Sequence, residues 1–125
     1  GQIDGGVVMG QGYALQEECR LVDGIPVTLG FESGGVPTSM DAAPTIEAIF
    51  IQHPDPHGPF GVRGIGEITM IPVVPAITAA IHDACGIWID HLPASPTRIR
   101  SALASKGIPS AAPAGASPRV RDPRV

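Results

Sequence analysis

The pattern of apolar positions predicts that the chain opens with a helix over residues 4–19. Val8, Leu15 and Cys19 lie near one face of such a helix. Glycine recurs inside the same stretch, and each interior glycine costs a helix about 1 kcal/mol relative to alanine. Close packing against another element or a cofactor would explain why the helix tolerates them. These glycines are Gly5, Gly6, Gly10 and Gly12.

Two further helices are predicted in the second half of the chain. Residues 74–85 form a mostly apolar run, and Gly86 follows at the position where glycine commonly ends a helix. The last helix is expected to begin at Ser95 or Pro96, because proline is favoured at the first helical position.

Short strands are predicted between these helices. Residues 45–52 carry apolar side chains on both sides of the alternation, which predicts a strand buried on much of both faces. Shorter strands are expected at 27–31 and 87–90, and Asp23-Gly24 is a turn signal. Together the elements predict an α+β fold with a small mixed sheet and three packing helices.

Composition refines this picture without changing the fold class. The chain contains 16 glycines and 14 prolines, which favours many turns and tight backbone contacts. Its length suits one small domain with one core, and we expect that domain to span residues 1–106. Residues 107–125 are rich in Pro, Ala, Ser and Arg and are predicted to form a disordered tail.

Charge and hydropathy exclude several function classes. The formal net charge is −4, which disfavours nucleic-acid binding through phosphate contacts, and the arginines at 119, 121 and 124 are predicted to be solvated. We expect no membrane span and see no signal peptide. Cys19 and Cys85 are far apart in sequence and are predicted to be free thiols. They favour a reducing compartment, with the cytoplasm preferred and the periplasm as the alternative.

The most informative stretch is residues 61–67, Gly-Val-Arg-Gly-Ile-Gly-Glu. Glycines let a backbone pass close to a ligand and expose its N–H groups. The stretch ends on Glu67, immediately before the apolar run. A carboxylate at such a point is either a helix cap or a catalytic base, and the pattern alone leaves both open.

Two other groups of polar residues are candidate sites. His53 and His57 flank a Pro-Asp-Pro turn, but their spacing fits no standard zinc pattern, so exposed histidines and no metal site are predicted. Glu17 and Glu18 are neighbours on a predicted helix and therefore point in different directions, which favours a solvated face.

Residues 58–67, Gly-Pro-Phe-Gly-Val-Arg-Gly-Ile-Gly-Glu, resemble a signature near the C-terminus of the molybdopterin-binding subunit of the molybdenum hydroxylases, the xanthine dehydrogenase and aldehyde oxidase family. Other segments agree in order, over about residues 1–105. They are residues 1–6 and 10–18 (the family's glycine-rich helix), 36–41 (its Ile-Pro-Thr segment), 72–86 (its final core helix) and 92–99 (its closing Leu-Pro-x-x-Pro motif).

The resemblance implies a role for Glu67. In the family, the glutamate in this position is the general base that takes the proton from a Mo–OH group, whose oxygen then attacks an electron-poor carbon. The implied reaction is oxidation of an aldehyde or an N-heteroaromatic carbon with oxygen from water. The alternative is a non-catalytic assembly or interaction domain that retains the family's fold.

The resemblance also implies cofactor contacts. The candidates are Gln2, Gly5, Gly6, Arg63, Gly64 and Gly66. An amide such as that of Gln2 can pair with a pterin edge as donor and acceptor. Arg63 could face an anionic cofactor or substrate, or reach solvent.

The chain begins at Gly1 without Met and enters the family's motifs at once, so we expect a piece of a larger polypeptide or one product of a split subunit. The remainder of the molybdopterin-binding subunit would share the molybdenum cofactor. Iron–sulfur clusters and FAD would reside in partner chains or domains, and the isolated chain would be inactive. Two positions depart from the family: Ile68 replaces the usual proline after Glu67, with Thr69 next, and Gly34 stands where an aromatic residue is usual.

Overall fold

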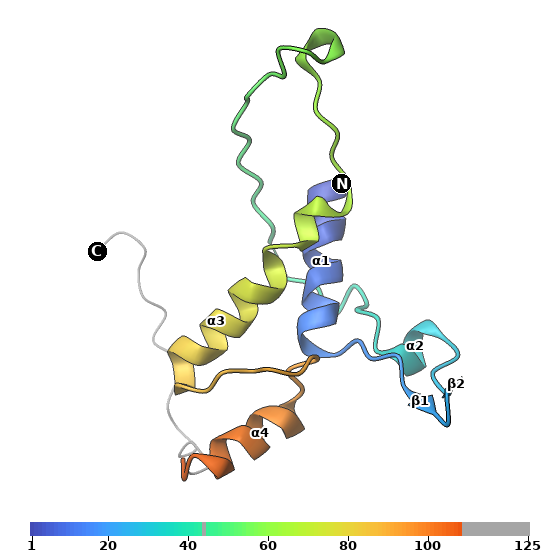
Figure 1. Ribbon diagram of the computed structural model, residues 1–125, viewed down its shortest axis with the longest axis vertical. Coiled ribbons are helices and arrows are strands. Elements are labelled where there is room, and N and C mark those ends of the chain that lie inside the picture. Colours follow the sequence, from blue (N-terminus) through green and yellow to red (C-terminus); the bar gives the residue numbers. More distant parts are fainter. Residues whose placement is uncertain (44, 109–125) are drawn as a thin grey trace.

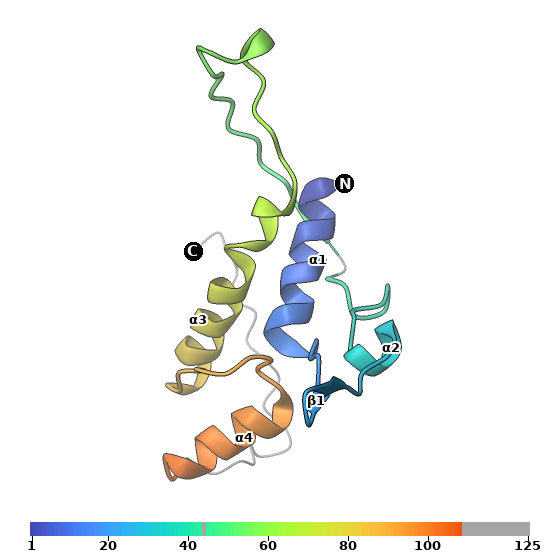
Figure 2. The ribbon, with the colours of Figure 1, turned by 45° about the vertical axis from the view of Figure 1, so that its right-hand side comes forward.

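The computed structural model describes residues 1–43 and 45–108. In Figure 1, the first helix stands at the centre, α3 lies beside it and α4 lies below them. Residues 45–66 run out and back as a long loop whose outer part stands clear of the helices in both views (Figures 1 and 2). The elements are α1 (Gln2–Leu15), β1 (Leu21–Val22), β2 (Ile25–Pro26), α2 (Phe31–Gly34), the 3₁₀ turns η1 (Pro59–Gly61) and η2 (Glu67–Met70), α3 (Val73–Cys85) and α4 (Pro96–Ser105).

Glycine allows α1 to lie directly against η2 and the start of α3. Gly6 and Gly10 are buried in this contact. A Cβ added at Gly6 would lie 2.8 Å from the Cβ of Thr69 and would overlap its hydroxyl oxygen. A Cβ at Gly10 would lie 2.6 Å from the Cβ of Val73. Neither glycine can therefore carry a side chain unless η2 and α3 move away, which explains the glycines inside this helix.

The predicted bounds of the first helix are wrong, and its buried residues are not those of the apolar face that the pattern indicated. The helix runs from Gln2 to Leu15, and its buried positions are Gly6, Gly10, Gly12 and Ala14. It ends early because Gln16 leaves helical geometry, while the N–H groups of Gln16 and Glu17 both donate to the carbonyl of Gly12. Cys19, which the apolar pattern placed near one face with Val8 and Leu15, lies beyond the helix and is exposed, and both cysteines are free thiols as expected.

A small core lies at the C-terminal end of α1. Within the described residues, the buried hydrophobic side chains are Ala14, Ile87 and Ala94, each 1% exposed or less. The N–H of Ala94 donates to the carbonyl of Ala14 at 2.6 Å, which joins the segment before α4 directly to α1. This contact brings the segment that leads into α4 against the end of the first helix.

Arg98 strengthens the same junction. Its guanidinium donates to the carbonyl of Pro93 at 2.9 Å and to the carboxylate of Glu18 at 2.8 Å. Glu18 is therefore an ion-pair partner, and the prediction that it belongs to a simple solvated face is wrong. Both side chains remain partly exposed, so solvent weakens the ion pair and its contribution to stability is small.

The two C-terminal helix predictions are confirmed. α3 begins at Val73, and Gly86 follows it with φ of 71°, the left-handed conformation in which glycine ends helices. Pro96 is the first residue of α4, and the hydroxyl of Ser95 accepts a hydrogen bond from the N–H of Arg98 at 3.3 Å.

Most of the strand predictions are wrong. The sheet in the described residues is one antiparallel pair, in which Val22 faces Ile25. Asp23 and Gly24 connect the pair with positive φ, which confirms the predicted turn. No strand forms at 27–31, where the chain enters α2, nor at 87–90, where Ile87 is instead part of the small core.

Residues 45–52 do not form the predicted buried strand. The segment has no strand partner among the described residues, and Ile49 and Ile51 are 83% and 92% exposed. A strand is stabilised by hydrogen bonds to neighbouring strands, and the described residues provide no such neighbour for this segment. The mixed sheet therefore remains a prediction, which requires strands from outside the described residues.

The Pro-Thr segment after α2 packs across α1. A Cβ at Gly12 would lie 2.7 Å from Pro37 Cδ, and the side-chain amide of Gln11 donates to the carbonyl of Asp41. The hydroxyl and the N–H of Thr38 both donate to the Asp41 carboxylate, at 2.7 and 2.8 Å. These bonds lower the pKa of Asp41 from its ordinary value because they favour the ionised form.

One apolar segment, Glu67–Cys85, is long and apolar enough to cross a membrane by length and composition, with a mean hydropathy of 1.5. The continuous helix within it, α3, has 13 residues. Such a helix is about 20 Å long, shorter than the roughly 30 Å hydrocarbon core of a bilayer. No residue of this window is fully buried. Of the predicted tail, residues 109–125 lie outside the described residues.

We expect Gly6→Ala to destabilise the folded protein by about 1–3 kcal/mol, because the new methyl group would force η2 away from α1. Alanine favours a helix over glycine, so the substitution would stabilise α1 if no close contact were present. A loss of stability therefore indicates the close contact between α1 and η2. Thermal and denaturant unfolding of the purified protein measure it.

Gly5→Ala is the matched control, because a Cβ at Gly5 meets no atom within 4 Å. This variant should be neutral or more stable by up to about 1 kcal/mol. Equal destabilisation by the two substitutions would contradict the packing role of Gly6.

Candidate functional site

A cavity of about 160 Å³ lies at the N-terminal end of α1. Its lining comes from two regions far apart in sequence: one face of α1, and the residues that begin η2. The lining residues are Gln2, Gly5, Gly6, Met9, Gly66 and Glu67. The four helical positions follow i, i+3, i+4 and i+7 spacing, so one face of α1 forms one wall.

Glu67 is the first residue of η2 and is exposed. Gly66 precedes the turn in a non-helical conformation, and no side chain caps η2. Within the described residues, the Glu67 carboxylate makes no hydrogen bond or ion pair. No hydrogen bond among the described residues therefore supports the interpretation of Glu67 as a helix cap. The carboxylate is available to a ligand.

Glycines keep the space beside Glu67 open. A Cβ built at Gly5 or Gly66 would meet no atom within 4 Å. A ligand can therefore approach the backbone on both sides of the cavity without meeting a side chain. Gln2, which is exposed, adds an amide that can donate and accept hydrogen bonds.

Two predicted cofactor contacts, Arg63 and Gly64, line a different hollow. That hollow, about 620 Å³, lies between the two legs of the long loop and includes Phe50 and Phe60. The Nε–H of Arg63 donates to the carbonyl of His53 at 2.7 Å, so Arg63 ties one leg to the other. The structure therefore joins Gln2, Gly5, Gly6, Gly66 and Glu67, but does not bring Arg63 and Gly64 into their cavity.

Sequence reasoning missed Met9 as a cavity residue. The signal was present, because Met9 continues the helical face of Gln2, Gly5 and Gly6 by one turn. The helix is predicted from its bulky apolar residues, Val8 and Leu15, which indicate a different face.

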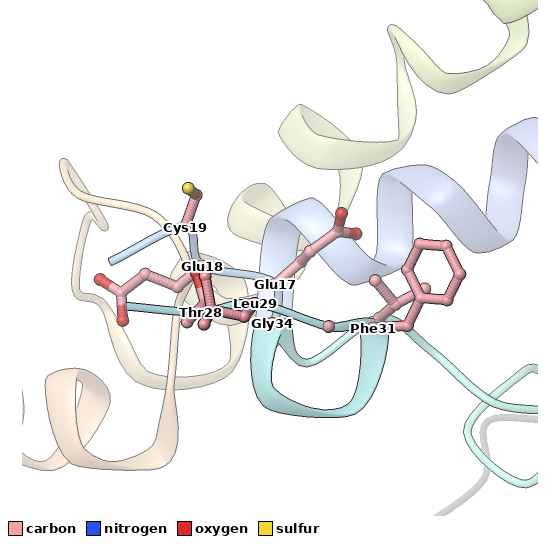
Figure 3. Close-up of a pocket in the computed structure, with 9 residues that line it drawn as sticks. Glu17, Glu18, Cys19, Thr28, Leu29, Phe31 and Gly34 are labelled. Atoms are coloured by element: carbon pink, nitrogen blue, oxygen red, sulfur yellow. The ribbon is translucent and has the colours of Figure 1, made fainter. Parts of the chain in front are cut away.

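A second cavity, of about 300 Å³, lies between the end of α1 and α2 (Figure 3). Its lining includes Glu17, Glu18 and Cys19. Figure 3 shows the two carboxylates pointing to opposite sides, and that of Glu18 is paired with Arg98. The two acids therefore do not form a catalytic pair.

The histidine turn gives no metal site in the part of the chain that the structure describes. His53 and His57 are exposed, as predicted. Across residues 1–43 and 45–108, no group of three or more His, Cys, Asp or Glu side chains gathers in a way that could hold a metal ion.

Comparison with known proteins gives a consistent set of relatives. The chain is 38% identical over 108 residues to a probable xanthine dehydrogenase subunit of Bacillus subtilis strain 168, covering 86% of this chain and 14% of the relative. It is 35% identical over 103 residues to the aldehyde oxidoreductase of Megalodesulfovibrio gigas, covering 82% and 11%.

A third relative is the xanthine dehydrogenase molybdenum-binding subunit of Escherichia coli O157:H7, 35% identical over 102 residues, which cover 79% of this chain and 13% of the relative. The chain thus spans 14% or less of the length of each of these relatives. No family model matches the chain.

Proposed function

The chain belongs to the xanthine dehydrogenase and aldehyde oxidase family of molybdenum hydroxylases, and we propose that it forms one wall of the catalytic centre of a molybdenum-dependent oxidoreductase. One observation carries the proposal. The glycine-rich start of α1 and the Gly66-Glu67 pair, some 60 residues apart in sequence, line one open cavity that ends on the Glu67 carboxylate.

The residues present fit the edge of a molybdenum–pterin cofactor. The open space at Gly5 and Gly66 admits a flat ring close to the backbone, and Gln2 offers an amide to the ring's polar edge. The cavity of about 160 Å³ is smaller than the roughly 300–1,000 Å³ of a complete small-molecule site, so this chain supplies only part of the wall. The metal itself would be held by the pterin.

When bound, the cofactor supplies the water-derived oxygen nucleophile and accepts the two electrons removed from the substrate. Glu67 acts as the general base that takes the proton from that nucleophile. Glu67 begins η2 beside glycines, which would leave room for a bound group next to its carboxylate. An aldehyde or an N-heteroaromatic compound would be the substrate.

The rest of the catalytic centre comes from the remainder of the molybdopterin-binding subunit. Two features of the chain support this. The chain spans only a small part of each relative, and large apolar side chains on the long loop and on η2 are exposed, among them Phe50, Phe60 and Ile68. Residues 45–52 would complete a mixed sheet with strands from that remainder, and electrons would leave through iron–sulfur and flavin partners.

Replacing the proposed base tests the catalytic role. In the assembled, cofactor-loaded enzyme, Glu67→Gln keeps the size and hydrogen-bonding capacity of the side chain but removes the base. We expect the limiting rate of reduction by substrate, normalised per bound molybdenum, to fall by at least about 100-fold. Rapid-mixing absorbance of the reduced cofactors measures it.

Glu32→Gln is the control, because Glu32 is an exposed carboxylate on α2 and does not line the cavity. Its rate should change by less than about threefold. A Glu67→Gln enzyme that is reduced as fast as the parent would remove Glu67 from catalysis and favour a non-catalytic assembly domain.

The proposed sheet completion predicts a change in amide protection. In the full-length subunit, the amide protons of residues 46–52 should exchange slowly, because strand neighbours would accept their hydrogen bonds. In the isolated chain the same amides should exchange at rates typical of an open chain. Equally fast exchange in both would contradict the pairing of this segment with the remainder of the subunit.

A further inference from the structure

Thr69 connects the two walls of the Glu67 cavity. It lies in η2, two residues after Glu67, and its side chain is half-buried. Its hydroxyl group lies 3.0 Å from the carbonyl oxygen of Gln2 and 3.1 Å from that of Gly66, and it can donate to either. Gln2 belongs to the α1 wall and Gly66 to the opposite wall, so one side chain spans the junction.

The packing around Thr69 leaves this side chain little freedom. A Cβ at Gly6 would overlap the Thr69 hydroxyl oxygen and would lie 3.2 Å from the N of Met70. Gly6 thus makes the room in which the hydroxyl meets the backbone of α1. Threonine is also restricted at χ1 by its branched Cβ, which helps to keep the hydroxyl in place.

The backbone hydrogen bonds that close η2 are long. Residue 68 is Ile, whereas proline would fix φ near −65° at this position. The N–H of Thr69 lies 3.4 Å from the carbonyl of Gly66, a long hydrogen bond. The side-chain hydroxyl, at shorter distances, is the stronger restraint on the turn.

We propose that Thr69 is a positioning residue for Glu67: its hydroxyl holds η2 against the first turn of α1 and thereby fixes where the Glu67 carboxylate lies relative to Gln2 and the bound cofactor. This inference rests on the proposed function of Glu67. Thr69 does not touch the reacting group, and it acts through the placement of the carboxylate that does. Such placement matters, because an error of about 1 Å can cost about 100-fold in rate.

The test uses the assembled, cofactor-loaded enzyme with Thr69→Val, which keeps the branched shape but removes the hydroxyl. The limiting reduction rate per bound molybdenum should fall by about 10- to 100-fold, while KM changes by less than about threefold. Thr69→Ser, which restores the hydroxyl, should recover the rate to within about threefold of the parent.

A matched control is Thr78→Val on α3. The Thr78 hydroxyl also donates to a backbone carbonyl, that of Pro75 at 3.2 Å, but it lies outside the cavity. This variant should keep the parental rate. Amide exchange gives a second readout that does not need turnover. Thr69→Val should speed exchange in residues 67–71, whereas Thr78→Val should leave that segment unchanged.

A double substitution separates positioning from stability. If Thr69 acts through Glu67, Thr69→Val should have almost no further effect on the rate of the Glu67→Gln enzyme. A further loss of about 10-fold would overturn the proposal, and so would a Thr69→Ser enzyme as slow as Thr69→Val. A Thr69→Val enzyme with the parental reduction rate and parental amide exchange in residues 67–71 would also overturn the proposal. In that case a slow Glu67→Gln enzyme would still support the proposed function of Glu67.

Discussion

The close approach of α1 to η2 and α3 organises the described part of the chain. It is possible because Gly6 and Gly10, one helical turn apart, present no side chain to Thr69 and Val73. Glycine is unfavourable inside a helix, so the sequence accepts a weaker α1 in exchange for backbone contact. The small core of fully buried side chains lies at the other end of α1.

The same contact builds the candidate site. The α1 face that packs on η2 is adjacent to the face that carries Gln2, Gly5 and Met9, so docking η2 against Gly6 brings Glu67 to the edge of this second face. Fold and candidate site therefore meet at one point: the glycine that lets the turn dock also brings the proposed base beside the proposed cofactor contacts. Thr69 lies at that point.

The surface left uncovered by this arrangement is as informative as the contacts. α3 exposes small apolar residues such as Ala76 and Ala80, and the long loop exposes Phe50, Phe60 and neighbouring apolar side chains. Large exposed apolar patches usually mark interaction surfaces. This agrees with a chain that spans 14% or less of each relative described above.

Features that depend on local chemistry could be predicted from the amino-acid sequence alone. Gly86 and Pro96 mark the end of α3 and the start of α4, Asp23-Gly24 makes the hairpin turn, and the ordered glycine motifs indicated the family. The buried face of α1 could not be predicted in this way, because its packing surface consists of glycines that carry no hydrophobic signal. Tertiary packing also separates Arg63 and Gly64 from the cavity, and it leaves residues 45–52 without a partner in the described chain. A strand needs a neighbour that no local pattern within the described residues can supply.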